Sequence, residues 1–258
     1  METPFLTENK TTATTTMATT TTTTKTTTIM FSIEGNIGSG KSLLLEKLRI
    51  KLSPDSSHNE PYIEVDGIKK RVCFVQEPVD IWTSIKDKDG TDMITKYYGD
   101  QKRYAFSFQM MAYISRLSLL KKAVKENYDI IITERSMFTD SNVFAKMLYD
   151  DGTIEDVNYI IYKKWFDEFL PELPKINVIY IKADPKVAHD RIKKRDRSGE
   201  VIPIEYLENC HNYHENWLET DESKMVIDAN TDNSLPENKS VYEKWTGDMK
   251  DYIISKTM

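Results

Sequence analysis

The sequence predicts an α/β fold, a phosphate-loop protein with a five-stranded parallel sheet covered by helices on both faces. Short apolar runs alternate with longer segments of helical periodicity, and polar residues follow each run. The runs are too short and too rich in β-branched or aromatic residues to be buried helices. The expected strands are residues 29–33, 72–75, 128–132, 176–181 and 225–227. Because such sheets bind ligands beyond the carboxyl ends of their strands, we expect the site there.

Composition excludes several classes of protein. The formal net charge of −6 is unsuited to a general nucleic-acid or anionic-membrane binder, which needs a positive field. The chain has no apolar run of about 18 residues, the length that spans a bilayer. Two cysteines, Cys73 and Cys210, cannot build a disulfide framework, which favours a reducing compartment. We therefore expect a cytoplasmic protein that binds neither nucleic acid nor membrane.

The first 28 residues differ from the rest. Fourteen of the eighteen residues from 11 to 28 are threonine, and such a tract cannot bury a core, so we expect a disordered tail. A mitochondrial leader is rich in Arg and poor in acids, whereas this segment has no Arg and carries Glu2 and Glu8. Residues 29–258 are expected to form one domain.

A phosphate loop follows the first expected strand. It consists of Gly35, Asn36, Ile37, Gly38, Ser39, Gly40, Lys41 and Ser42, which match G-x-x-x-x-G-K-[ST]. Leucines at helical spacing come next, so the loop opens a helix whose N-terminus favours a phosphate anion. Lys41 is expected to reach the β- and γ-phosphates, and the Ser42 hydroxyl to bind Mg²⁺. The sequence therefore predicts an ATP- and Mg²⁺-binding site.

The next strand ends favour a kinase. A guanine-reading Asn-Lys-x-Asp motif is missing from the sequence, which disfavours a GTPase. Glu77 precedes Pro78, which holds it extended at a strand tip, where its carboxylate can take the proton of an incoming hydroxyl. Glu134 and Arg135 follow the third strand. Glu134 is positioned to hold Mg²⁺ with Ser42, and Arg135 to stabilise charge on the acceptor or the phosphoryl group.

Five motifs in the same order make residues 29–233 resemble the deoxyribonucleoside kinases, in particular the branch that acts on deoxycytidine, deoxyguanosine and deoxyadenosine. The motifs are the phosphate loop, Glu77-Pro78-Val79 with Trp82, Phe106-Ser107-Phe108-Gln109, Glu134-Arg135-Ser136 with Asp140, and Arg195-x-Arg197 with Glu200. The resemblance implies a homodimer that transfers the ATP γ-phosphate to the 5′-hydroxyl of a deoxynucleoside. Glu77, Arg135 and Lys41 are then the expected catalytic residues.

The acceptor site is expected on one helix and the segments beside it. Gln109 and Arg116 share a helical face with Ala112 and Tyr113 within residues 101–125. The resemblance implies that Gln109 makes paired hydrogen bonds to the base, which suits its amide. It places Arg116 and Asp140 at the base edge, an arrangement that thymidine-preferring members lack.

Four further residues are assigned to the acceptor by resemblance. Phe144 is expected to stack on the base, and Trp82 to close the pocket beside the sugar. Tyr98 and Glu200 match the pair that binds the sugar 3′-hydroxyl.

A basic segment is expected to form a lid over the ATP phosphates. Arg191 and Arg195 lie at helical spacing, and Arg197 follows. They supply cations where charge spreads during phosphoryl transfer and help to exclude water. Asp232 is also assigned to the ATP site. The chain departs from the family at Ser198-Gly199-Glu200, where many members carry two adjacent acids.

Two other functions share parts of this pattern. A nucleoside monophosphate kinase of thymidylate-kinase type has the same loop and lid, but Glu77 would place an anion where its acceptor phosphate binds. A phosphate-loop ATPase or regulatory switch would leave Gln109, Arg116 and Asp140 unexplained. Guanine, adenine and cytosine all fit the base site, and we favour a purine deoxynucleoside over deoxycytidine, in nucleotide salvage. Residues 53–70 are expected to be a surface excursion.

Overall fold

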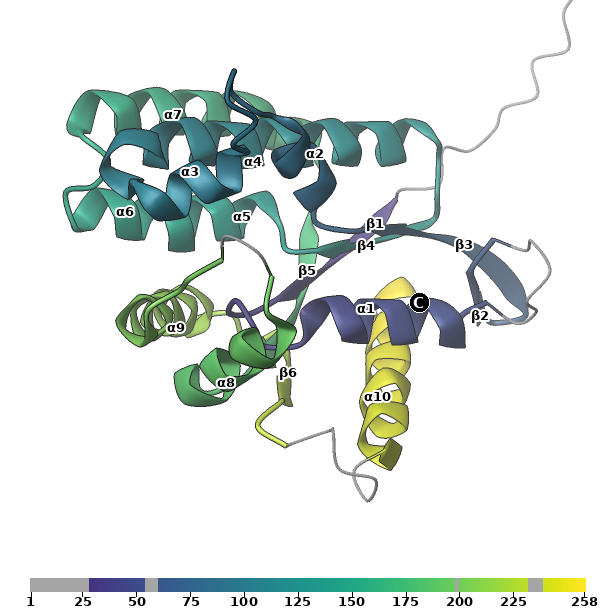
Figure 1. Cartoon of the computed structure of the whole chain (residues 1–258). Coiled ribbons are helices and arrows are strands. Elements are labelled where there is room, and N and C mark those ends of the chain that lie inside the picture. Colours follow the sequence, from purple (N-terminus) through teal and green to yellow (C-terminus); the bar gives the residue numbers. More distant parts are fainter. Residues whose placement is uncertain (1–27, 54–59, 198–199, 232–238) are drawn as a thin grey trace, which may run out of the picture.

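The computed structural model describes residues 28–53, 60–197, 200–231 and 239–258 (Figure 1). The tail expected at residues 1–28 therefore lies outside the described residues, except for Thr28. Within the described part, no helix combines the length and the apolar character needed to cross a membrane.

The sheet has the order β2-β3-β4-β1-β5-β6. Five of its strands are parallel: β1 (Ile29–Glu34), β3 (Ile68–Val75), β4 (Ile130–Glu134), β5 (Ile176–Lys182) and β6 (Met225–Asp228). The parallel sheet predicted from the sequence is confirmed. β4 runs two residues later than expected, so Glu134 is its last residue instead of following it.

A sixth strand corrects the expected strand count. β2 (Tyr62–Val65) pairs antiparallel with β3, within the segment expected to be a surface excursion. Asp66 and Gly67 join the two strands with φ of 50° and 76°. A two-residue turn with both φ values positive fits the twist of a hairpin, and Asp-Gly is a preferred sequence for it. Polar residues on both sides of the short strand hid this signal.

Helices cover both faces of the sheet, as predicted (Figure 1). On one face α1 (Lys41–Lys51) packs with α10 (Lys239–Thr257), and on the other α4 (Gln101–Lys125) packs with α7 (Asp156–Phe169). The remaining helical elements are α2 (Val79–Ser84), α3 (Met93–Gly99), α5 (Met137–Thr139), the π-helical segment η1 (Asp140–Ala145), α6 (Lys146–Asp150), η2 (Leu170–Glu172), α8 (Pro185–Arg195) and α9 (Ile204–Leu218).

The register brings three predicted site segments together at one edge. β1 lies at the centre of the sheet between β4 and β5, and Ile33 of β1 is the partner of Glu134 of β4. Val75 of β3 pairs with Thr133, so Glu77 emerges beside Arg135. Since all three strands point the same way, the phosphate loop, Glu77 and Glu134 leave the sheet at the same edge.

Candidate active site

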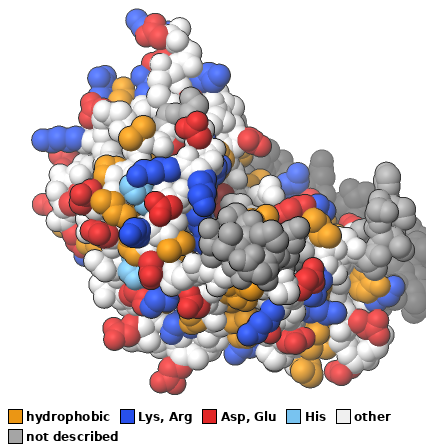
Figure 2. All heavy atoms as spheres, turned by 60° about the horizontal axis from the view of Figure 1, so that its bottom comes forward, with side chains coloured by type: hydrophobic (Ala, Val, Ile, Leu, Met, Phe, Trp, Pro, Cys, Tyr) orange, Lys and Arg blue, Asp and Glu red, His pale blue; other side chains and the backbone are white. Residues whose placement is uncertain are grey.

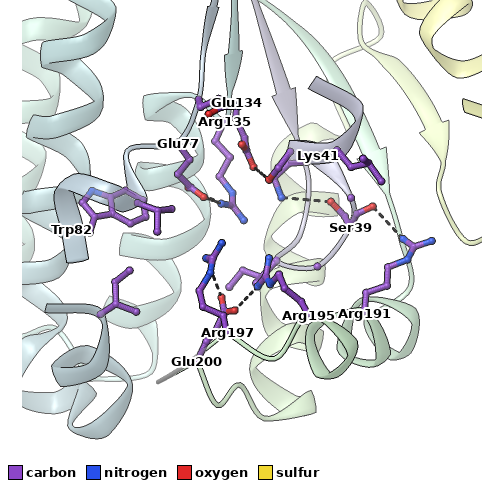
Figure 3. Close-up of a pocket in the computed structure, with 18 of the residues that line it drawn as sticks. Ser39, Lys41, Glu77, Trp82, Glu134, Arg135, Arg191, Arg195, Arg197 and Glu200 are labelled. Atoms are coloured by element: carbon purple, nitrogen blue, oxygen red, sulfur yellow. Dashed lines mark hydrogen bonds and ion pairs between the residues drawn. The ribbon is translucent and has the colours of Figure 1, made fainter. Parts of the chain in front are cut away.

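A cavity of about 1240 Å³ lies at this edge of the sheet and contains most of the predicted site residues (Figure 3). Its lining includes Ile37, Gly38, Ser39, Gly40, Lys41, Ser42, Glu77, Trp82, Tyr98, Gln109, Glu134, Arg135, Asp140, Phe144, Arg191, Arg195, Arg197 and Glu200. Of the other predicted residues, Gly35, Asn36 and Arg116 lie outside this lining, and Asp232 lies outside the described residues.

The phosphate loop fits tightly against the elements beneath it. A Cβ at Gly35 would lie 2.4 Å from the Ile181 carbonyl oxygen, and one at Gly38 would lie 2.4 Å from that of Ala188. Both glycines also have positive φ, so a side chain at either would clash and strain the backbone. Asn36 anchors the loop to α9, because its Nδ2 donates to the Leu207 carbonyl oxygen at 2.8 Å.

The Lys41 side chain points back into the phosphate loop. Its Nζ donates to the Asn36 carbonyl oxygen at 2.6 Å, and the residue is only 4% exposed. Burial and the nearby Arg135 lower the pKa of Lys41 to about 7, against the raising effect of Glu134 and Glu77. The ammonium group is thus poised to gain from an anionic phosphate placed in the loop.

Ser42 and Glu134, the predicted metal ligands, are in direct contact. Ser42 Oγ donates to Glu134 Oε1 at 2.5 Å. A hydroxyl and a carboxylate are the hard oxygen donors that Mg²⁺ prefers. In the described part of the chain no group of three His, Cys, Asp or Glu residues could hold a metal ion. Mg²⁺ is usually held by one or two carboxylates together with substrate phosphates.

Glu77 is held between two arginines. Arg135 Nη1 donates to both carboxylate oxygens of Glu77, at 2.6 and 2.7 Å, and Arg116 Nη2 donates to Oε1 at 3.1 Å. Burial alone would raise the pKa of Glu77, but Arg135, Arg116 and Lys41 lower it to about 2. Glu77 is therefore an ionised carboxylate facing the cavity.

The Arg135 backbone is in the left-handed region, with φ of 60°. A non-glycine residue held there costs free energy and is often found at functional sites. Its N–H donates to the Ile33 carbonyl oxygen at 3.0 Å, which fixes the turn beside the phosphate loop. This turn aims the Arg135 guanidinium at Glu77.

Arg116 lies behind the cavity wall, with 2% of its side chain exposed. Its Nε donates to Asp140 Oδ2 at 2.9 Å, and its Nη1 donates to the Glu134 carbonyl oxygen at 2.8 Å. Asp140 does line the cavity. Burial raises the pKa of Asp140, and Arg116 opposes that effect. Of the two residues expected at the base edge, Asp140 therefore faces the cavity, and Arg116 holds it from behind the cavity wall.

Several aromatic side chains line the part of the cavity where the sequence predicts the acceptor. Trp82 donates from Nε1 to Ser115 Oγ at 2.9 Å and meets Phe108 edge-to-face at 5.5 Å. The Arg135 guanidinium lies 5.2 Å from the centre of the Phe144 ring. Gln109 is 2% exposed, and its Oε1 has no hydrogen-bond partner among the described residues, although it is buried in the cavity wall. Such an oxygen is suited to a polar ligand group.

Several cavity residues were missed from the sequence. Phe108 stacks on Tyr97 at 4.4 Å, and the Tyr97 hydroxyl lies 3.0 Å from that of Tyr206. All three line the cavity together with Ile94. Phe108 lies in the motif Phe106-Ser107-Phe108-Gln109 described above. Tyr206 belongs to α9, and its position beside Tyr97 depends on how α9 packs against the rest of the chain.

The predicted lid residues carry ion pairs and backbone contacts. Arg195 and Arg197 both pair with Glu200, the latter at 3.9 Å, as Figure 3 shows. Arg191 donates to the carbonyl oxygens of Ser39, at 3.1 Å, and Ala229, at 2.7 Å. The basic segment is therefore connected both to the phosphate loop and to the Glu200 carboxylate.

The chain is similar to known proteins along most of its length. Residues 31–254 match the family model of deoxynucleoside kinases. The chain is 32% identical over 230 residues to the probable deoxycytidine kinase of fowlpox virus, covering 86% of this chain and 87% of the viral protein. Identity to chicken deoxycytidine kinase 2 is 30%, over 80% of this chain and 78% of that protein. Identity to human deoxycytidine kinase is 32%, over 72% and 74% respectively.

Proposed function

The chain belongs to the deoxynucleoside kinase family, and on that premise we propose that Glu77 is the general base that activates the acceptor's 5′-hydroxyl. The enzyme is an ATP-dependent deoxynucleoside kinase. The observation that carries the proposed role is the position of an ionised Glu77 in the same cavity as Lys41 and Gln109.

The proposed step is an in-line phosphoryl transfer. The 5′ O–H bond breaks and its proton passes to a Glu77 oxygen. A bond forms between the 5′-oxygen and the γ-phosphorus as the bond from that phosphorus to the β,γ-bridging oxygen breaks, which releases ADP. Lys41, and Arg135 beside Glu77, stabilise charge on the transferred group.

Ser42 and Glu134 would hold Mg²⁺, and their contact supports that assignment. When bound together with ATP, the ion would neutralise negative charge on the phosphates. Arg195 and Arg197 would supply further positive charge from the lid side, and their present pairing with Glu200 keeps them near the acceptor side.

We further propose that the preferred base carries an exocyclic amino group. Asp140 in the cavity wall can accept a hydrogen bond from such a group, and thymine has none. The sequence pattern favours a purine deoxynucleoside, whereas the relatives named above are deoxycytidine kinases. A panel of four deoxynucleosides with ATP decides between them. The proposal predicts that thymidine is the poorest substrate, and thymidine as the best one would overturn it.

A homodimer is proposed from the family resemblance, and an apolar surface supports it. Val157, Ile160, Ile161 and Trp165 of α7 are 38–64% exposed, and Ile114 of the adjacent α4 is 53% exposed. Exposed apolar patches of this kind mark interaction sites. Light scattering should report a dimer, and Ile160→Glu should give a monomer. A wild-type monomer at micromolar concentration would overturn the proposal.

The proposed setting is nucleotide salvage in the cytoplasm. Both cysteines are free thiols, in keeping with a reducing compartment. Among the described residues, basic and acidic side chains are interspersed over the face shown in Figure 2. That mixture gives no support to a nucleic-acid partner on this face.

The test of the function as a whole is ADP release from ATP with and without an acceptor. A deoxynucleoside should stimulate ADP release strongly, because transfer requires its 5′-hydroxyl. Stimulation by a deoxynucleoside monophosphate instead would identify a monophosphate kinase. Equal ADP release without any acceptor would identify an ATPase.

A further inference from the structure

Glu34 is a buried carboxylate that the proposed mechanism does not use. It is the last residue of β1, it is 0% exposed, and the phosphate loop begins at the next residue. Burying a carboxylate costs free energy unless hydrogen bonds compensate for the lost water. The contacts of Glu34 therefore indicate what it does.

Two hydroxyl groups hold the Glu34 carboxylate. Ser32 Oγ donates to Oε1 at 2.5 Å, from the same strand. Thr139 Oγ1 donates to Oε2, from a segment 105 residues away in the sequence. Thr139 is itself 0% exposed. The second hydrogen bond is thus a buried tether between β1 and α5.

The two ends of this tether lead directly to the two halves of the site. Gly35 follows Glu34 and starts the loop for the donor phosphates. Asp140 follows Thr139 and begins the π-helical segment η1, which also presents Phe144 to the cavity. π-Helical turns are rare and are often found at functional sites. A shift of either tether end would change the spacing between donor and acceptor.

We propose that Glu34 is a positioning residue, which acts through Thr139 to hold the donor loop and the acceptor wall at the separation needed for transfer. This inference rests on the site roles proposed above. It assigns no contact with either substrate to Glu34 or Thr139. Reacting atoms must lie within about 3–3.5 Å of one another, so a displacement of about 1 Å can lower a rate by about 10²-fold.

The Glu34 side chain also acts on a charged residue of the site. Lys41 and Arg135 lie on the cavity side, and the field of Glu34 acts on Lys41 to favour its charged form. A hydrogen bond to a charged acceptor is stronger than one between neutral groups. A carboxylate at this place therefore makes a stronger tether than a neutral amide.

The experiment removes the tether with little change in side-chain volume. Thr139→Val deletes the hydroxyl, and Thr139→Ser keeps it. Thr246→Val is the matched control, since Thr246 is also buried and its hydroxyl donates to the Tyr242 carbonyl oxygen within α10. Single-turnover phosphorylation of the best deoxynucleoside, the KM for both substrates, the Kd of a non-hydrolysable ATP analogue and the unfolding temperature are measured for all variants.

We expect Thr139→Val to lower the single-turnover rate by about 10- to 100-fold, because the reacting groups lose alignment. The Kd of the ATP analogue should change by less than about threefold, and Thr139→Ser should recover most of the rate. Thr246→Val should lower the unfolding temperature by a similar amount with a near-normal rate. A normal rate in Thr139→Val, or no recovery in Thr139→Ser, would overturn the proposal.

A double-mutant cycle tests whether Glu34 acts through Thr139. Glu34→Gln keeps the size of the side chain but removes the charge and replaces one acceptor oxygen by an NH₂ donor, so one of the two hydrogen bonds must reverse its direction. It should therefore weaken the tether without emptying the site. The rate loss in the double variant Glu34→Gln with Thr139→Val should be smaller than the product of the two single losses. Independent losses that multiply would contradict the link. The cycle does not use Glu77, so its result can be interpreted even if Glu77 proves not to be the general base.

Discussion

The Glu77 carboxylate and the Arg135 guanidinium form a closely paired unit, with Arg135 Nη1 2.6 and 2.7 Å from the two carboxylate oxygens. Glu77 is 14% exposed and Arg135 is 6% exposed, so the pair is largely removed from water. The register of β3 and β4 places them together. The arginine keeps the carboxylate charged and also orients it toward the cavity.

We first predict the effect of removing the proton acceptor. Glu77→Gln keeps the size of the side chain, and its rate of phosphoryl transfer should fall by roughly 10²- to 10⁴-fold. Single-turnover measurement on a deoxynucleoside checks this, and the nucleoside Kd should change far less. Glu60→Gln, on an exposed ion pair with Arg71, is a charge-matched control that should retain the normal rate. A Glu77→Gln variant with near-normal turnover would contradict the base role.

We next predict that kcat/KM for ATP falls at alkaline pH. The pKa of Lys41 is lowered to about 7 in the free enzyme, mainly by burial, so the ammonium form is lost as the pH rises above 7. The value of kcat/KM for ATP, which reports the free enzyme, should therefore decline above about pH 7. kcat should persist to higher pH, because bound phosphate favours the charged lysine.

Lys41→Arg supplies the control for this profile. A guanidinium stays charged throughout the accessible range, so the alkaline decline should disappear even if overall activity falls. A decline that survives in Lys41→Arg would assign the titration to another group.

The third prediction concerns base selection by Asp140. Asp140→Ala combined with Arg116→Met should lower activity on the best substrate and raise the rate on thymidine relative to it by at least about tenfold, since polar groups that oppose thymine are removed. Both residues must change together. Removing Arg116 alone leaves Asp140 as a buried unpaired carboxylate, at a cost of about 3–5 kcal/mol of stability. Removing Asp140 alone leaves Arg116 paired with Glu77.

Denaturant unfolding and the four-nucleoside panel check both parts of this prediction. The Arg116→Met single variant should be less stable than the double variant. Relative rates that stay unchanged across the panel in the double variant would refute the assignment of Asp140 to the base.

The sheet and the phosphate loop could be predicted because their signals are local. Apolar runs of strand length and the glycine spacing of the loop are visible within ten residues. The β2–β3 hairpin was missed, although Asp66-Gly67 is a recognisable turn, because a four-residue edge strand carries little apolar pattern. The phosphate-loop context was sufficient to predict that Ser42 and Glu134 lie close together, and the two side chains are in contact.

Other features depend on how distant elements dock, which one sequence does not show. Helical spacing put Arg116 on the correct face of α4, but only packing decides that it lies behind Asp140 and reaches Glu77. Tyr206 joins the cavity through the docking of α9. Glu34 has no pattern of its own, and its tether to Thr139 appears only once β1 and α5 are placed together.

A fourth prediction concerns the threonine-rich segment. Deletion of residues 1–27 should leave the turnover number within about twofold of the full chain, since its composition cannot contribute a packed core. Steady-state assays of the two proteins with the same nucleoside check this. A large loss of turnover would show that the segment takes part in the reaction.

The last prediction concerns Glu200, which pairs with Arg195 and Arg197 while lining the cavity. If its carboxylate also accepts a hydrogen bond from the sugar 3′-hydroxyl, Glu200→Gln should raise the KM of a deoxynucleoside by about 10-fold, as expected for a lost charge-assisted hydrogen bond. A 3′-deoxy analogue lacks that hydroxyl, so its KM should hardly change. The KM of ATP separates this sugar contact from the pairing of Glu200 with the two arginines. In Glu200→Gln the KM of ATP should stay within about threefold of the wild-type value if the arginines still reach the phosphates. Glu222→Gln, at another acidic position on the chain, is the control for a general change in charge. Equal KM increases for the deoxynucleoside and its 3′-deoxy analogue would exclude the contact with the 3′-hydroxyl and leave Glu200 as a partner of the lid arginines alone.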